Sequence, residues 1–131
     1  MIEIDQNQLR LLSDAAWLVR KNARLYGPTA VGCAVLSGDD RIFAGCNLEH
    51  RFRSHDIHAE VNALSSLVAG GAANAIVVMI AAERDRFTPC GSCLDWIFEI
   101  GGEECLVLNE RAPGRVDHRY LVGELMPFYP S

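Results

Sequence analysis

Apolar residues at the start of the chain recur every three or four positions, which is the period of a helix. Between Asp5 and Leu25 they form one face (Leu9, Leu12, Ala16, Val19 and Ala23). Asp5 and Gln8 have the spacing of a capping box, so Asp5 marks the start of this helix. Gly27-Pro28 marks its end. The pattern predicts an amphipathic helix that covers a sheet.

Four short apolar runs have the length of β-strands. Val31–Ser37 and Arg41–Cys46 flank the turn Gly38-Asp39-Asp40, which predicts a β-hairpin. Ala75–Ala82 and Cys105–Leu108 are continuously apolar, as is typical of strands that are buried on both faces. The sequence therefore predicts a sheet with a buried centre.

Helices and loops fill the rest of the chain. Glycine pairs after two apolar stretches predict where two of these helices end. The predicted segments are helices at His58–Val68, Cys90–Ile100 and Tyr120–Met126, and loops at 47–57, 83–88 and 112–119. Because helices and strands alternate, we expect a single α/β domain over residues 1–131, a sandwich with a mixed sheet.

Composition excludes several classes of protein. The 131 residues are half hydrophobic and carry a formal net charge of −5, which fits one globular domain and argues against a nucleic-acid binder. No apolar run is long enough to cross a bilayer, and the chain start does not resemble a secretion signal. Five cysteines without an export signal indicate a reducing cytoplasm, with thiols used for a metal or in the core.

Two short motifs carry the chemistry. Cys90 and Cys93 have the spacing at which two thiolates at a helix start bind one ion, and His58 is the candidate third ligand. Glu60 follows His58 by two positions. The order H-x-E and then P-C-x-x-C is the signature of zinc deaminases. Three protein ligands leave the fourth position of zinc to water, and Glu60 is the predicted proton carrier.

Two other uses of these cysteines are open. Cys46 would close a four-ligand zinc site in a non-catalytic binding module, which leaves Glu60 without a purpose. Alternatively, Cys90-Gly91-Ser92-Cys93 would form a reversible disulfide in a thiol redox protein. Otherwise Cys33 and Cys46, within the predicted strands, are expected to be buried apolar residues.

The chain resembles the cytidine deaminase family, in particular its small homotetrameric branch, which includes blasticidin S deaminase-like members. The resemblance rests on Val31-Gly32, on Asn47-Leu48-Glu49 eleven residues before the metal motif, on Pro-Cys-Gly-Ser-Cys at 89–93, and on Leu125-Met126-Pro127. It implies a three-layer α/β/α sandwich with a central mixed sheet of about five strands. It further implies a cytoplasmic hydrolase of pyrimidine salvage that deaminates cytidine or deoxycytidine with one Zn²⁺ per chain. The expected assembly is a homotetramer or dimer with sites near subunit contacts.

The resemblance also implies substrate contacts. Asn47 and Glu49 match the residues that bind the ribose hydroxyls, although Asn47 serving the turn after its strand and a merely solvated Glu49 are the alternative reading. Ala59, Thr88 and Pro89 complete the expected substrate-binding set: the carbonyl near Thr88 accepts from the substrate amine, and Pro89 fixes the backbone that enters the metal turn.

The chain departs from the family around the substrate. Thr29 replaces a ring-packing Phe, and Arg53 replaces a loop Tyr. Arg51 and Arg53 belong to a cationic cluster at 50–55, which suits an acidic substrate such as a nucleotide or a blasticidin-type nucleoside. Alternatively these arginines pair with neighbouring subunits or with acidic residues. The family's base-stacking C-terminal Phe corresponds to Phe128 or Tyr129, but in neither case in the same register; Phe87 lines the base pocket or packs in the core.

Overall fold

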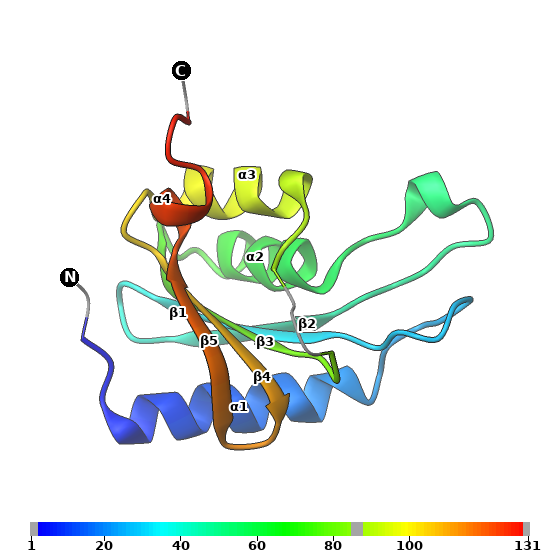
Figure 1. Ribbon diagram of the computed structural model, residues 1–131, viewed down its shortest axis with the longest axis horizontal. Helices are drawn as coiled ribbons and strands as arrows, with labels where there is room; N and C mark the ends of the chain where they lie inside the picture. The colour runs from blue at the N-terminus through cyan, green and yellow to red at the C-terminus, as the bar shows by residue number, and fades with distance from the viewer. Residues whose placement is uncertain (1–2, 85–87, 130–131) are drawn as a thin grey trace.

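A five-stranded mixed sheet separates one helix from two others in the computed structural model, which describes residues 3–84 and 88–129. α1 covers one face, and α2 and α3 lie side by side on the other (Figure 1). The elements are α1 (Gln6–Arg20), β1 (Gly32–Ser37), β2 (Ile42–Cys46), the 3₁₀ helix η1 (Arg53–His55), α2 (Ala59–Ala69), β3 (Ala75–Ala81), α3 (Gly91–Gly101), β4 (Leu106–Ala112), β5 (Arg115–Leu121) and α4 (Val122–Leu125). The three-layer α/β/α prediction is confirmed.

In the strand order β2-β1-β3-β4-β5, the two strands that precede α2 and α3 run in the same direction and end on the same side of the molecule. β1 is antiparallel to both β2 and β3, and β3 is parallel to β4. β4 and β5 form an antiparallel hairpin at the sheet edge. Because α2 follows β2 and α3 follows β3, both helices begin at the same end, on the right in Figure 1.

The core has two layers because side chains alternate across the central strands. Val77 and Met79 of β3 face α1, where they pack with Leu12. Val78 and Ile80 face the other layer, where they pack with residues of α2 and α3 that include Leu64, Leu67 and Ile97. The continuously apolar β3 is therefore buried on both faces, as predicted.

α1 begins as predicted and ends five residues earlier. Asp5 accepts from the Gln8 amide at 2.7 Å and donates to the Gln8 side chain at 3.2 Å, so the capping box is confirmed. The predicted extension to Leu25 is wrong, because Arg24 leaves the helix to pair with Leu48. Its N–H donates to the Asn47 carbonyl at 3.0 Å. None of the helices in the described ranges is long and apolar enough to cross a bilayer.

The predicted loop at 112–119 is also wrong. Most of this segment forms β5, which pairs with β4 after a turn at Gly114, whose φ is +79°. β5 is an edge strand, where charged residues are tolerated and blunt edge-to-edge pairing, so its sequence shows no apolar run. The strand extends to Leu121, which shortens the predicted terminal helix to Val122–Leu125.

Gly32 lets α1 lie close to β1. A Cβ at Gly32 would be 2.0 Å from the Ala16 carbonyl oxygen and 2.8 Å from Arg20 Cβ. Gly32→Ala is therefore expected to lower the free energy of unfolding by about 1–3 kcal/mol, measured by urea denaturation. Gly91→Ala is the control, because nothing lies within 4 Å of its Cβ position. Equal stabilities of the two variants would contradict this account of the α1–β1 contact.

Candidate metal centre and active site

Three predicted ligands converge where α2 and α3 begin. His58 is the N-cap of α2, Cys90 is the N-cap of α3, and Cys93 lies in the first turn of α3. His58 Nδ1 lies 3.3 Å from Cys93 Sγ and 3.4 Å from Cys90 Sγ. One ligand atom from each residue lies within 4.8 Å of the other two. The parallel arrangement of the two helices thus brings together motifs that are separated in the sequence.

The donor set fits zinc. Tetrahedral zinc with Zn–N of ~2.0 Å and Zn–S of ~2.3 Å places the nitrogen about 3.5 Å from each sulfur, close to the observed separations of 3.3 and 3.4 Å. Without a cation, burial and the nearby Glu60 carboxylate raise the pKa of the Cys93 thiol. A divalent cation reverses this effect, because a coordinating thiol is deprotonated. These residues can therefore hold one Zn²⁺ per chain.

The donor set also separates the alternatives for the cysteines. Among the described residues, no fourth histidine, cysteine or carboxylate joins the three-residue group, and Cys46 lies buried at the end of β2 outside it. A closed four-ligand site is therefore not supported. A thiol redox pair needs no third donor, whereas His58 lies within 3.4 Å of both sulfurs. The position of His58 therefore favours a metal site over a redox pair.

Glu60 lies in the first turn of α2 and is 2% exposed. Burial raises the pKa of its carboxyl, while the neighbouring His58 and Cys93 act in the opposite direction. A carboxylate in this environment can exchange a proton more readily near neutral pH than an exposed one. It lines the same cavity as His58 and Cys90.

This cavity has a volume of about 260 Å³ and contains most of the predicted substrate-binding residues. Those that line it are Asn47, Glu49, Arg53, Ala59 and Thr88. Pro89, Arg51 and Phe128 are not among its lining residues, and Phe128 is 86% exposed. Phe87 lies outside the described residues.

Sequence reasoning missed Asp56, Ile57 and Arg84, which also line the cavity. For Asp56 there was a usable signal: it follows Arg53 by three positions, a spacing at which opposite charges pair. The sequence offered no comparable signal for Ile57 or Arg84.

The Asn47 side chain holds one wall of the cavity. Its Oδ1 accepts from the Val31 amide at 2.9 Å, and its Nδ2 donates to the Thr29 carbonyl at 2.9 Å. Both partners belong to the segment that precedes β1 and not to the turn after β2, the strand that Asn47 follows. An amide has two lone pairs and two hydrogens, so one of each remains for a ligand.

The Glu49 carboxylate is hydrogen-bonded to the loop that contains Tyr26 and Gly27. Its Oε1 accepts from the amides of Tyr26 at 2.6 Å and Gly27 at 2.7 Å, and Oε2 accepts from Arg53 at 2.9 Å. The Gly27 and Tyr26 amides hold the pKa of this carboxyl below its usual range. The alternative that Glu49 is merely solvated is therefore wrong.

Comparisons with known proteins agree with this site. Residues 6–109 match the family described as the cytidine and deoxycytidylate deaminase zinc-binding region. The chain is 29% identical to a cytidine deaminase of Mycobacterium tuberculosis (strain H37Rv) over 128 residues, 97% of this chain and 90% of that protein. It is 29% identical to a probable cytidine deaminase of Dictyostelium discoideum over 127 residues, 95% of this chain and 84% of that protein.

The fold agrees with solved structures as well. A crystal structure of cytidine deaminase from Burkholderia pseudomallei has a TM-score of 0.83 at 27% identity and covers 95% of this chain and 98% of its own. The family match spans most of the chain and includes all three candidate ligands. The chain therefore belongs to the cytidine and deoxycytidylate deaminase family of zinc-dependent aminohydrolases.

Proposed function

We propose that this protein deaminates cytidine or deoxycytidine to the uracil nucleoside with release of ammonia. The observation that carries the proposal is the convergence of His58, Cys90 and Cys93 beside the buried Glu60, at a cavity that His58, Cys90 and Glu60 line. The named relatives, which are cytidine deaminases, support the choice of a nucleoside.

The mechanism assigns one proton carrier. A zinc ion held by His58, Cys90 and Cys93 would lower the pKa of a water bound to it from ~16 toward ~7 and so supply a nucleophile at neutral pH. The Glu60 carboxylate would take one proton from the attacking water and pass it to the ring nitrogen of the substrate. It would then take the remaining proton from the hydroxyl that has added to the ring carbon and pass it to the amine, which leaves as ammonia. Burial of Glu60 suits this role, because it raises the carboxyl pKa toward the working pH.

The remaining cavity residues are assigned to substrate binding. Asn47 and Glu49 bind the ribose hydroxyls, and Ala59 and Thr88 lie against the base. Pro89 fixes the backbone that enters the metal turn. The hydrogen bonds of Asn47 and Glu49 to the loop at 26–31 support this assignment, because they fix both side chains in the cavity wall.

A substrate that bears an acidic group, such as a nucleotide or a blasticidin-type nucleoside, is the second candidate. Arg51 and Arg53 suggested it, but Arg51 does not line the cavity and Arg53 pairs with two carboxylates of this chain. The geometry therefore favours a neutral nucleoside.

We assign a homotetramer, or alternatively a dimer, as the oligomeric state. The assigned role is pyrimidine salvage in the cytoplasm. An apolar groove of about 330 Å³ lies between α2 and α3 and includes Val68 and Trp96, which are half exposed. A groove of this kind suits a second copy of the chain. Phe128 is exposed, so its ring is free to contact the active site of a second copy of the chain.

The test is the loss of ultraviolet absorbance by the zinc-loaded protein across a small panel. We expect turnover of cytidine and deoxycytidine, slower turnover of cytosine, of the two monophosphates and of blasticidin S, and one zinc per chain. Faster turnover of a monophosphate or of blasticidin S would favour the second candidate. Absence of turnover across the whole panel would refute the proposed function.

A further inference from the structure

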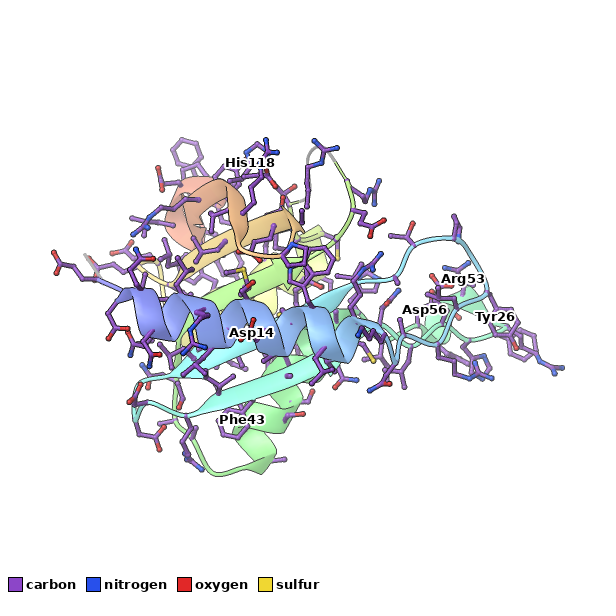
Figure 2. All side chains as sticks on the ribbon, turned by 90° about the horizontal axis from the view of Figure 1, so that it is seen from below. Asp14, Tyr26, Phe43, Arg53, Asp56 and His118 are labelled. Atoms are coloured by element: carbon purple, nitrogen blue, oxygen red, sulfur yellow. The ribbon has the colours of Figure 1, made fainter. Side chains whose placement is uncertain are left out.

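Arg53 lies at the edge of the cavity and donates hydrogen bonds to two carboxylates. Its Nε donates to Asp56 Oδ2 at 2.8 Å, and one terminal nitrogen donates to Glu49 Oε2 at 2.9 Å. Figure 2 shows Arg53, Asp56 and Tyr26 together where loops project beyond the sheet. The guanidinium therefore joins two carboxylates from one loop.

Most of the hydrogen-bonding positions of the Glu49 carboxylate are occupied by groups of this chain. It accepts two main-chain N–H groups on Oε1 and the guanidinium on Oε2. The Glu49 carbonyl is held as well, by Arg24 at 2.6 Å. A carboxylate offers about four lone-pair directions, so these three donors leave one on Oε2. The Glu49 carboxylate can therefore accept one further hydrogen bond from a ligand in the cavity.

We propose that Arg53 is a positioning residue that aims the last acceptor direction of Glu49 at a sugar hydroxyl, and that the pocket selects a sugar without an anionic group. The inference rests on the proposed function, since it needs a nucleoside in this cavity. Arg53 makes its ion pairs with Glu49 and Asp56. It acts through Glu49.

The selection against anions follows from charge. Two of the five N–H groups of Arg53 donate to the carboxylates of Asp56 and Glu49, and the three side chains together are net negative. Asp56 is held in turn, because its Oδ1 accepts from the His50 amide at 2.7 Å. A phosphate at this edge would meet a cluster that already carries a net negative charge. A sugar hydroxyl carries no charge and is not repelled.

The experiment compares Arg53→Gln, Arg53→Lys and the control Arg41→Gln with the parent protein. Arg41 makes a similar contact with Asp39 at 2.8 Å at the β1–β2 turn and does not line the cavity. The substrates are cytidine, 2′,3′-dideoxycytidine and CMP. Zinc content and thermal midpoint are measured for every variant.

For Arg53→Gln we expect the KM for cytidine to rise about tenfold or more with kcat within threefold, because a charge-assisted hydrogen bond is lost from Glu49. The turnover of dideoxycytidine changes little, so the preference for cytidine over dideoxycytidine falls. Arg53→Lys restores part of the affinity, and Arg41→Gln behaves as the parent. CMP is the poorest substrate of the parent protein.

Three results would overturn the proposal. Equal losses for cytidine and dideoxycytidine would mean that Arg53 serves only the fold. An unchanged KM would mean that Glu49 needs no positioning. A parent protein that prefers CMP, and loses CMP turnover selectively in Arg53→Gln, would make Arg53 a phosphate ligand. By contrast, a zinc-loaded parent that deaminates none of these substrates refutes the proposed function itself.

Discussion

Replacing Glu60 by glutamine is expected to lower kcat by about 10²–10⁴-fold, the usual contribution of a positioned acid–base group, and to leave zinc in place. Glutamine has nearly the same shape but cannot accept a proton from water or return it to the substrate. Because Glu60 is buried and lies beside the metal ligands without being one of the three, its replacement removes proton transfer and spares the donor set. Steady-state absorbance assays and metal analysis measure the two effects.

The matched control is Glu104→Gln, which makes the same chemical change at an exposed position outside the cavity lining. It should retain the parent kcat. A Glu60→Gln protein that deaminates at the parent rate would refute the assigned proton carrier. A Glu60→Gln protein that has lost its zinc would instead make Glu60 part of the metal site.

The positions of the metal ligands were predictable because local signals specify them. His58 and Cys90 were predicted as the first residues of two helices and are the N-caps of α2 and α3. Gly102, at the predicted end of the second helix, has a φ of +79°, which glycine adopts readily. Each half of the motif lies at the start of its own helix and glycines follow the helix end, so each helix can be predicted from its own segment.

Features that depend on distant partners were not predictable. The apolar period continues beyond Arg20, but the bridge between Arg24 and Leu48 ends α1 there. β5 forms because its backbone pairs with the edge of β4. Its own residues show little of the apolar pattern that predicts a strand. In both cases pairing with another segment decided the local structure, and local propensity is weaker than such pairing.

The substrate side of the site follows the same rule. The types and spacing of Asn47 and Glu49 indicated a role in the pocket, but which groups they bind depends on the loop at 26–31. For Arg53 the sequence left two options open, an acidic substrate or pairing with neighbouring subunits or acidic residues, and the structure confirms pairing with acidic residues. Its contacts with Glu49 and Asp56 became apparent only when the two loops were placed together.

Replacing Cys93 by serine is expected to reduce bound zinc from one per chain to almost none and to lower kcat by about 10³-fold or more. The activity loss follows because Lewis-acid activation of water contributes several kcal/mol, and each 1.36 kcal/mol corresponds to a factor of ten. Cys93 is fully buried in the first turn of α3, and a serine hydroxyl at that position is a poor zinc ligand. The thermal midpoint should fall as well, since zinc that binds only the folded state stabilises it.

Cys46→Ala distinguishes loss of a ligand from loss of any buried thiol. Cys46 is also buried, but it lies outside the three-residue group. If the site has three protein ligands, Cys46→Ala retains zinc and turnover while its stability falls modestly from the lost packing. Zinc loss in Cys46→Ala would instead show a fourth sulfur on the metal. Because a four-ligand site has no position for water, that single result would contradict both the donor set and the proposed hydrolysis.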